Sequence, residues 1–370
     1  MKVLRGYKTE LAPNNKQRSF FRRCAGTSRF VWNWGLATWK YWYGDGKPTS
    51  GYRLCRQFNA IKDEQCPWIR EMPYAVTEAA FRNLDAAFGH FFRRIKEGTD
   101  KAGYPKFKSR HHPRQSFQVR GTRIEHDRVR ITHVGWVRLK ERGYLPTSDS
   151  GMKMGTYATI SRTAGHWYIS IQAEQEIAEL KSDILTIGID FGLKTLAVLS
   201  NGETFENPHI LIAAERKLAR LNRELARRKQ GGANWHKTKE RLARQHANVA
   251  NVRRHVLHQI SHHVTAGLRP KVIVIEDLNV KGMTSNRHLS KAIADVGFYE
   301  LRRQIEYKAR WHGIDVIVAD RWYASSKTCS VCGWHNADLT LDDRTFCCPE
   351  CGLELDRDLN AALNLEHLAA

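Results

Sequence analysis

Four cysteines near the C-terminus constrain the fold of this chain more than any other feature. They form two Cys-x-x-Cys pairs separated by fifteen residues, Cys329 with Cys332 and Cys348 with Cys351. Two such pairs can close tetrahedrally on one Zn²⁺ through four thiolates, which predicts a zinc ribbon. Cys347 would change the spacing of the second pair, so we expect it to lie outside the site.

An acidic run follows the second cysteine pair directly. Asp356 and Asp358 belong to the run Asp-Arg-Asp-Leu-Asn-Ala-Ala-Leu-Asn, which is typical of a helix start. A carboxylate at this position would stand on a scaffold that the metal holds rigid, so the run is a candidate catalytic position. Because the two aspartates are two residues apart, they cannot share one helical face.

The composition indicates a polyanionic partner. The 370 residues contain 60 Lys+Arg and 38 Asp+Glu, a net charge of +22. Residues 1–180 hold 32 basic and 16 acidic side chains, or +16, which leaves 28 and 22, or +6, for the remainder. A nucleic-acid backbone is the usual counter-charge for such a surplus.

We expect no membrane partner and a cytoplasmic location. No apolar run approaches the roughly 20 residues of a membrane span, and the N-terminus lacks the apolar core of a signal peptide. Eight cysteines, of which four follow a zinc pattern, suit a reducing compartment better than a disulfide scaffold.

Hydrophobic periodicity predicts where the regular elements lie. The first part shows a strand, two helical blocks and then short strands of a small barrel or curved sheet, over 2–10, 16–36, 73–97, 115–119, 122–132, 136–140, 154–162 and 166–173. The second part shows four strands and three helical stretches, over 184–190, 195–199, 213–229, 234–265, 271–276, 296–313 and 314–319. The composition changes near 110 and near 180, which predicts boundaries there.

Basic side chains of the first part are candidate nucleic-acid contacts. They stand between the aromatic residues of the second helical block and in the basic segment 103–110: Arg82, Arg93, Arg94, Lys106, Lys108 and Arg110. A merely solvated face would mix both signs of charge. Basic residues on the predicted strands have two interpretations that stay open, contact with a nucleic-acid backbone or solubility of a strand edge.

Acidic residues end two of the predicted apolar strands. Asp190 closes the strand at 184–190, and Glu276 closes the strand at 271–276. Together with the acid that opens the final helix, they form the pattern of an RNase H-like nuclease. Carboxylates at neighbouring strand ends supply the hard oxygen ligands that two Mg²⁺ ions need for hydrolysis of a phosphodiester.

Several segments closely resemble TnpB, the OrfB-type protein of bacterial insertion sequences and a relative of type V CRISPR effectors. The most specific are GIDFGLKTLAVLSNG, VIVIEDLNVKGM, YASSKTCSVCG and CPECGLELDRDLNAALNL. Weaker similarity runs through the whole chain, from NNKQ and SRFVWNWGL to FRNLDAAFGHFF, GYPKFKSR and VANVRRHVLHQIS. The resemblance implies an RNA-guided DNA endonuclease of the bacterial cytoplasm or nucleoid. It would bind a transposon-derived guide RNA and cut target double-stranded DNA beside a short flanking motif.

The resemblance also implies a fold class, α/β plus β-barrel. An RNase H-like (RuvC) nuclease domain with an inserted zinc ribbon would follow a wedge-type β-barrel that a helical recognition lobe interrupts. The expected boundaries are 1–12 and 111–180 for the barrel, 13–110 for the lobe, 181–326 and 353–370 for the nuclease, and 327–352 for the ribbon.

The resemblance assigns roles to individual positions. Asp190 and Glu276 match the first two metal ligands of the family. One residue separates Asp358 from the Asn-Ala-Ala sequence, and Asp358 matches the third metal ligand of the family. Asp356 would then be the helix cap or a group that supports the site. Arg344, between the cysteine pairs, matches an arginine near the cleaved strand and could neutralise phosphate charge.

Other assignments compete with the nuclease. A nuclease-inactive descendant would bind the same RNA and DNA to repress transcription, but we expect it to have lost at least one of the three acids. A transposase proper would use a nucleophilic tyrosine with a metal-binding histidine pair, and we find no such His-x-His arrangement. An accessory transposition protein is a further alternative. A zinc-ribbon RNA-binding factor would leave the strand-end acids unexplained.

Two further groups of titratable residues have a plain interpretation. His255, His258 and His262 share a helical face and could hold a metal, but solvent or RNA contact fits them better. Asp277 and Asp320 stand near the expected metal site, and only their orientation decides whether they take part.

Overall fold

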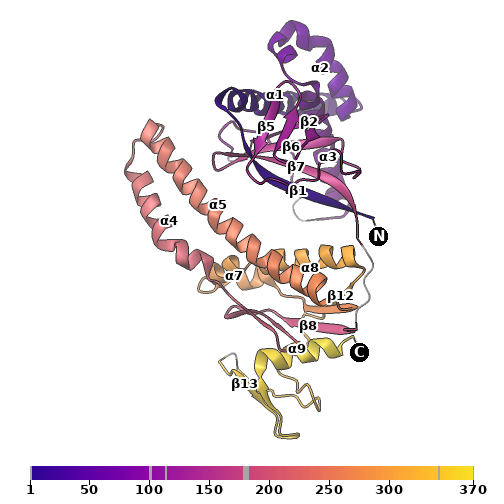
Figure 1. Ribbon diagram of the computed structural model, residues 1–370, viewed down its shortest axis with the longest axis vertical. Coiled ribbons are helices and arrows are strands. Elements are labelled where there is room, and N and C mark those ends of the chain that lie inside the picture. The colour runs from indigo at the N-terminus through magenta and orange to yellow at the C-terminus, as the bar shows by residue number, and fades with distance from the viewer. Residues whose placement is uncertain (1, 100–101, 113–114, 178–182, 341, 370) are drawn as a thin grey trace. The chain divides into compact units, whose positions relative to one another are not determined.

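The computed structural model of the protein describes residues 2–99, 102–112, 115–177, 183–340 and 342–369. The chain divides into two compact units, Lys2–Gln175 and Glu176–Ala370, which are coloured indigo to magenta and magenta to yellow in Figure 1. Each unit contains its own buried cores.

The N-terminal unit is built on one seven-stranded sheet. Its strands lie in the order β2-β6-β7-β1-β5-β4-β3. Their bounds are β1 Lys2–Ala12, β2 Gln115–Arg120, β3 Arg123–Ile124, β4 Arg128–Ile131, β5 Gly135–Leu139, β6 Tyr157–Thr163 and β7 His166–Glu176. The helices are α1 Asn15–Gly44, α2 Gly51–Gln65, a 3₁₀ turn Pro67–Glu71 and α3 Tyr74–Lys96. The predicted strands and the two predicted helical blocks are present, whereas α2 was not predicted.

The sheet is open, so the predicted closed barrel is not confirmed. Strands β2 and β3 stand at its two ends, and within the described ranges no pairing joins them. Helices α1 and α3 contact β2, and Arg120 of β2 forms an ion pair with Glu78 of α3 at 2.8 Å. Helices therefore pack against this end of the sheet, and β3, with only two residues, offers little backbone for closure.

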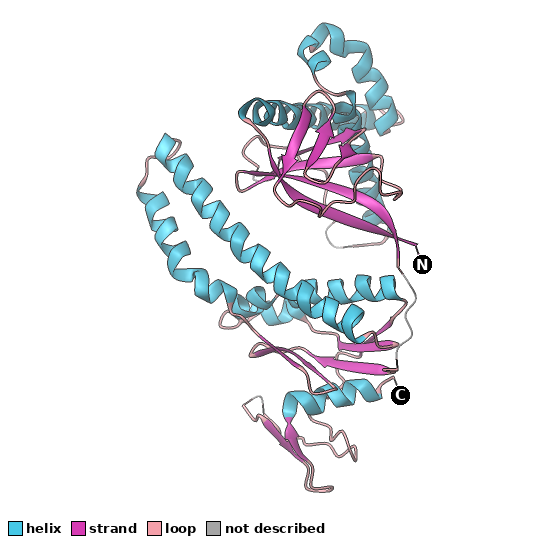
Figure 2. Ribbon diagram, in the orientation of Figure 1, coloured by secondary structure: helices cyan, strands magenta, loops and turns pink. Residues whose placement is uncertain are grey.

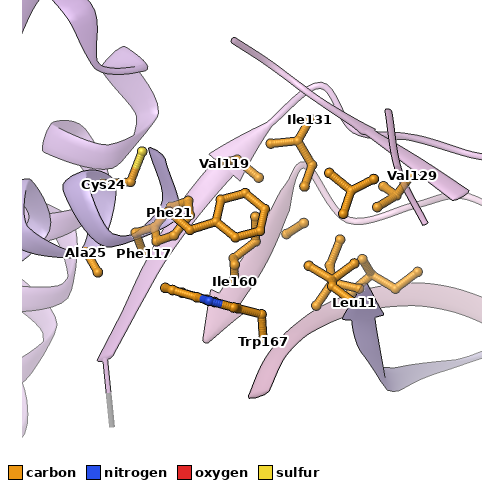
Figure 3. Packing of buried hydrophobic residues seen from close by; sticks show 14 of the residues in the cluster. Leu11, Phe21, Cys24, Ala25, Phe117, Val119, Val129, Ile131, Ile160 and Trp167 are labelled. Atoms are coloured by element: carbon orange, nitrogen blue, oxygen red, sulfur yellow. The ribbon is translucent and has the colours of Figure 1, made fainter. Parts of the chain in front are cut away.

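One half of α1 packs on the sheet and the other half packs on α2 and α3. Figure 3 shows Phe21, Cys24 and Ala25 of α1 beside Phe117 and Trp167 of the sheet, and the Phe21 and Trp167 rings lie 5.2 Å apart. A second cluster begins at Val31 and includes Trp39, Phe58 and Phe88. The predicted lobe 13–110 and the sheet thus share α1, and their boundary stays a prediction.

The C-terminal unit contains a five-stranded mixed sheet in the order β10-β9-β8-β11-β12. Strands β8, β11 and β12 run parallel, and β9 pairs antiparallel with both β8 and β10. The bounds are β8 Thr186–Asp190, β9 Thr195–Leu199, β10 Thr204–Glu206, β11 Val272–Glu276 and β12 Asp315–Ala319, with a separate hairpin of β13 Thr345–Cys347 and β14 Glu354–Asp356. This arrangement fits the RNase H-like class that the acids predicted.

The helices of this unit cover both faces of the sheet, as Figure 2 shows. Their bounds are α4 Ile210–Arg227, α5 Ala233–His262, a π-helical turn His263–Leu268, α6 Val280–Ser285, α7 Ser290–Val296, α8 Phe298–His312 and α9 Arg357–His367. The predicted helix 296–313 corresponds to α8, and α7 before it was not predicted. Gly297, whose φ of +77° favours glycine, ends α7.

Strand alternation decides which helix meets which face. Ile187 and Ile189 of β8 belong to one core with residues of α5 and α8, while Gly188 points the other way. A Cβ at Gly188 would lie 2.0 Å from the carbonyl oxygen of Ala362, so α9 can approach β8 closely only because this residue has no side chain. Leu365 of α9 packs near Val274 of β11 on the same face.

Candidate metal centre

Parallel pairing brings the first two predicted acids to one edge of the sheet. Asp190 is the last residue of β8, and Glu276 is the last residue of β11. The two strands are neighbours in parallel register, with Gly188 opposite Val274 and Ile189 opposite Ile275. Their carboxyl ends therefore coincide, and the Glu276 carboxyl group is close enough to Asp190 to contribute to its raised pKa.

The third predicted acid reaches this edge through α9. Asp358 stands in the first turn of α9, which crosses β8 at Gly188. Asp356 is the N-cap residue, because its Oδ1 accepts hydrogen bonds from the backbone N–H of Asp358 at 2.9 Å and of Leu359 at 3.0 Å. The two aspartates thus take different roles in the structure, and Asp356 directs its carboxylate to the helix start.

The electrostatics of Asp190 identify this edge as crowded with negative charge. Removal from solvent raises the pKa of Asp190 well above its usual range, and the hydrogen bond with Glu276 and the charges of Glu276 and Asp358 raise it further. Arg357 offsets part of this repulsion and lies 3.2 Å from Asp358 Oδ1. Three carboxylates with one nearby arginine fit a divalent cation, which would neutralise the repulsion through oxygen ligands.

The four cysteines form a tighter group than the carboxylates. Among the described residues they are the sole group of at least three metal-ligating side chains whose ligand atoms all lie within 4.8 Å of one another. The Sγ atoms of Cys329 and Cys351 are 3.6 Å apart, and those of Cys332 and Cys348 are 3.5 Å apart. The four cysteines of the predicted quartet therefore lie together. The three acids form no such compact group in the described residues, and the Asp358 carboxylate pairs with Arg357.

The surroundings of Cys329 favour a thiolate. Burial raises its pKa, but hydrogen bonds from the backbone N–H groups of Cys332 and Val331 outweigh this effect and bring the value to about 7. Cys347 is exposed in β13 and does not belong to the quartet, in agreement with the prediction.

Two buried asparagines fasten the ribbon to α9, a role that sequence reasoning missed. The side-chain amide of Asn360 donates to the Thr328 carbonyl at 2.7 Å, and its Oδ1 accepts from the Ser330 backbone N–H at 3.0 Å. Asn364, one turn later, donates to the carbonyls of Ser325 and Thr328 at 2.8 and 2.6 Å. The i, i+4 spacing of the two asparagines in the motif was the available signal.

Two cavities open beside Glu276. The larger, of about 440 Å³, is lined by Glu276, Asp277, Arg302 and Arg321 among others. The smaller, of about 120 Å³, is lined by Glu276, Asp277, Asp320 and Arg321 among others. Space for a substrate thus adjoins the acidic edge.

Asp277 and Asp320, the two further acids near the expected metal site, form hydrogen bonds within the protein. Hydrogen bonds from Arg302 and Arg321, at 2.8 and 2.6 Å, lower the pKa of Asp277. Asp320 accepts a hydrogen bond from the backbone N–H of Trp322 at 2.8 Å. Asp277 therefore faces two guanidinium groups, an arrangement that no local sequence pattern indicated.

Arg344 and the three histidines occupy different settings. The Arg344 carbonyl accepts a hydrogen bond from the Arg357 backbone N–H at 2.8 Å, which places the exposed Arg344 beside the start of α9. Burial, aided by the charge of Lys308, lowers the pKa of His258 to about 4. His255, His258 and His262 form no metal-binding group of the kind that the cysteines form in the described part of the chain.

The predicted nucleic-acid contacts of the N-terminal unit have varied surroundings. Arg82 lies over the Tyr157 ring at 3.7 Å, and Arg93 lies 3.7 Å from Glu97. Lys108 lies 3.4 Å from the centre of the Trp32 ring, and burial lowers its pKa to about 8. The remaining three take part in hydrogen bonds within the protein. The Arg94 side chain donates to the Ala102 carbonyl, and the carbonyls of Lys106 and Arg110 accept from the side chains of Trp32 and Gln115. Their contact with nucleic acid stays a prediction.

Sequence comparison finds relatives along almost the whole chain. The "Putative RNA-guided DNA endonuclease" of Streptomyces pristinaespiralis is 31% identical over 374 residues, which cover 98% of this chain and 89% of the relative. The "Putative RNA-guided DNA endonuclease InsQ" of Escherichia coli (strain K12) is 31% identical over 388 residues, which cover 99% of this chain and 92% of the relative.

Among the described residues, no helix has the length and apolar character that crossing a bilayer requires.

Family profiles and solved structures agree with these relatives. A profile described as "Probable transposase" matches residues 168–287, "Cas12f1-like, TNB domain" matches 298–365, and "Helix-turn-helix domain" matches 1–48. The Cas12f1 chain of a Cas12f1-sgRNA-target DNA complex shares the fold with a TM-score of 0.58 at 12% identity over 99% of both chains. The mini-RNA-guided endonuclease CRISPR-Cas phi3 gives 0.59 at 10% identity over 100% of this chain and 92% of the other. The chain belongs to the TnpB family, the OrfB-type proteins of insertion sequences.

Proposed function

We propose that this protein is the RNA-guided DNA endonuclease of a transposable element and that it cuts phosphodiester bonds at the edge formed by β8, β11 and α9. One observation carries the proposal: Asp190, Glu276 and Asp358 come from separate segments to a single acidic edge with adjoining cavities. Full-length relatives named as RNA-guided DNA endonucleases support the same activity.

The partners are a transposon-derived guide RNA and target double-stranded DNA. The Cas12f1 chain that shares this fold was solved in complex with sgRNA and target DNA, which supports the same two classes of partner here. The charge of +22 suits a protein that grips nucleic-acid backbones while base pairing supplies the sequence specificity. A flanking motif in the duplex would be read by the protein itself.

The side chains of the acidic edge have distinct tasks. Asp190, Glu276 and Asp358 would hold two Mg²⁺ ions, which supply an activated water and neutralise charge at phosphorus when bound. Asp356 fixes the start of α9, and with it the position of Asp358. Arg357 restrains the Asp358 carboxylate, and Arg344 would contact a phosphate of the substrate.

The zinc ion has a structural task. The four cysteines of the quartet would bind one Zn²⁺, and Asn360 and Asn364 join the ribbon to α9. We propose the boundaries given above for the wedge-type domain, the recognition lobe and the nuclease, and a location in the bacterial cytoplasm or nucleoid.

A nuclease-inactive RNA-guided repressor is the second candidate. It would require the same partners and no catalytic acids. All three acids are present, and removal from solvent together with the charges of Glu276 and Asp358 raises the pKa of Asp190, which is unfavourable for its carboxylate unless a cation is bound. This arrangement favours the nuclease.

The decisive experiment uses the protein purified with its RNA from cells that carry its element. The bound RNA is sequenced, and a plasmid library with a randomised flank beside the guide match is offered with Mg²⁺. We expect cleavage by the wild type and none by Asp190→Ala, Glu276→Ala or Asp358→Ala, while all three variants still bind the target. Asp356→Ala should retain weaker cleavage. Cleavage by all three alanine variants would refute the assignment, and target binding without cleavage by the wild type would indicate the repressor.

A further inference from the structure

The turn after β12 presents an unusual side chain next to the acidic edge. Trp322 is 87% exposed, the highest value among the large hydrophobic side chains of the described residues. Its backbone is fixed, because Asp320 accepts hydrogen bonds from the N–H of Trp322 through Oδ1 at 2.8 Å and from the N–H of Tyr323 through its carbonyl at 3.0 Å. An ordered turn therefore holds an indole in solvent, where it loses the burial that normally stabilises tryptophan.

The preceding residue connects this turn to the cavities. Arg321 lines both of them, and both are also lined by Glu276. The Arg321 side chain is 46% exposed, and Asp277 holds its guanidinium at 2.6 Å. A guanidinium has five N–H donors, so this contact leaves donors for a further anion.

Asp277 organises the cationic side of the larger cavity. It binds Arg321 and Arg302, and Arg302 also contacts Glu306 at 2.9 Å. Two guanidinium groups are thus oriented before a ligand arrives, which lowers the entropy that ligand binding costs. A pre-oriented guanidinium suits the paired oxygens of a phosphate.

We propose that Arg321 and Trp322 bind the DNA strand that enters the carboxylate edge, with Arg321 on a phosphate and Trp322 stacked on an unpaired base. Asp277 is the positioning residue for Arg321. This inference rests on the proposed endonuclease function and names how its substrate strand is held. The occupant is single-stranded, because the exposed face of an indole can stack only on a base that is free of its duplex neighbours.

The adjacent cation and aromatic group favour nucleic acid over a protein partner. Single-strand binding sites combine positive charge along the backbone with aromatic side chains that stack on bases. Arg321 and Trp322 supply one group of each kind at consecutive positions, and Arg321 lines both cavities together with Glu276.

The test measures single-turnover cleavage by the guide-loaded full-length protein. We compare Trp322→Ala, Trp322→Phe and Arg321→Gln with the wild type. Trp235→Ala serves as the control, because Trp235 belongs to the first turn of α5. Figure 1 shows that α5 begins away from the sheet of its unit. Trp322→Ala should lower the cleavage rate about 10- to 100-fold, as expected for the loss of one stacked base. Trp322→Phe should recover most of the rate, and Trp235→Ala should match the wild type.

Modified substrates separate strand binding from a structural effect. One abasic nucleotide is moved stepwise through the strand around the cut. At one position it should slow the wild type as much as Trp322→Ala does, and it should slow Trp322→Ala no further. A single neutral methylphosphonate in place of one phosphate should slow the wild type at one position and slow Arg321→Gln no further. Asp277→Asn should lose less cleavage rate than the wild type when that same phosphate is replaced.

The outcomes distinguish the two proposals. If the wild type binds RNA and target but does not cut, the endonuclease function fails. If the wild type cuts and Trp322→Ala cuts equally well, the strand-binding inference alone is wrong. Trp322→Ala could also cut more slowly while every abasic position slows it as much as it slows the wild type. This result would overturn the strand-binding inference and assign Trp322 to packing within the complex.

Discussion

A single half-buried aspartate is the residue on which the candidate site depends. Asp190 ends the central strand β8, and its neighbours Glu276 and Asp358 repel its charge. Its pKa is raised in the folded state, so the folded chain holds more protons than the unfolded chain between pH about 4, the usual value for aspartate, and the raised value. The free energy of unfolding of the metal-free protein therefore falls as pH rises through that window.

We expect Asp190→Asn to stabilise the metal-free protein at pH 7 while it abolishes cleavage. The amide removes the repulsion, and the melting temperature should rise by about 2–4 °C for each kcal/mol relieved. Thermal unfolding at pH 4 and pH 7 with a chelator present checks this, because the gain should shrink at the lower pH.

Asp315→Asn is the matched control for this measurement. Asp315 is exposed at the start of β12, at the opposite end of the parallel strands from Asp190 and Glu276. Mg²⁺ should raise the melting temperature of the wild type and of the control more than that of Asp190→Asn. Equal stabilisation of all three by Mg²⁺ would contradict a metal site at Asp190.

Residue-level reasoning predicted the acids but missed their partners. The apolar strands that end in Asp190 and Glu276 are visible as local patterns, and so is the acidic helix start. The pairing of Asp277 with Arg302 and Arg321 joins three segments, and no local pattern links residues so far apart. Arg357 is the sequence neighbour of Asp358, but only the side-chain geometry shows that the two form an ion pair.

At the scale of elements, the contact between β8 and α9 decides whether the third acid reaches the site. Gly188→Ala would place a Cβ 2.0 Å from the Ala362 carbonyl oxygen and 2.6 Å from the Glu366 nitrogen. Because both atoms belong to the backbone, α9 must shift. We expect a loss of about 1–3 kcal/mol in unfolding free energy and a large loss of cleavage, although all three acids remain. Chemical denaturation and single-turnover cleavage measure the two effects.

Gly89→Ala is the matched control for the glycine substitution. A Cβ there meets nothing within 4 Å, and the residue lies inside α3. Alanine should stabilise the helix by up to about 1 kcal/mol and leave cleavage unchanged. Wild-type cleavage by Gly188→Ala would show that the close approach of α9 is unnecessary.

The zinc ribbon is a second element whose loss can be measured directly. Elemental analysis should find about one zinc per chain. Cys329→Ser and Cys351→Ser should lose the metal and lower the melting temperature, because metal binding stabilises the folded ribbon. Cys347→Ser should keep the zinc, since its side chain stands outside the quartet. Retention of zinc by Cys329→Ser would contradict the ligand assignment.

Element prediction succeeded where periodicity was strong and failed where context decided. Most strands of both sheets and the long helices followed from apolar spacing. Helix α2, the short helices α6 and α7 and the three-residue strand β10 were missed. The predicted barrel is not confirmed, since the strands of the N-terminal sheet follow a linear order in the described residues. Strand pairing depends on contacts that one strand's sequence does not contain.

At the scale of the whole molecule, the charge of +22 determines how binding responds to salt. Affinity for the guide RNA should fall on the order of a thousandfold between about 50 and 200 mM salt if six or more phosphates are contacted. Arg110→Gln should reduce the slope of log affinity against log salt by about 1 if Arg110 contacts a phosphate. Filter binding over a salt series provides the measurement.

Arg70→Gln offers a control with the same change of charge. Arg70 already forms an ion pair with Asp63 at 2.8 Å, so its charge is balanced within the protein. Its substitution should leave the slope unchanged. Equal slopes for the wild type and Arg110→Gln would remove Arg110 from the predicted contacts.

The sequence by itself determined the family, the basic character and the spacing of the four cysteines of this protein, and it predicted the three acids. Each of these depends on residue type and on spacing along the chain, which local patterns retain. Only the tertiary structure decided that Asp356 caps α9 while Asp358 approaches Asp190, that Asn360 and Asn364 join the ribbon to this helix, and that the N-terminal sheet is open. These features depend on which distant segments pack together, and that choice follows from the burial of whole faces, such as the approach of α9 to Gly188.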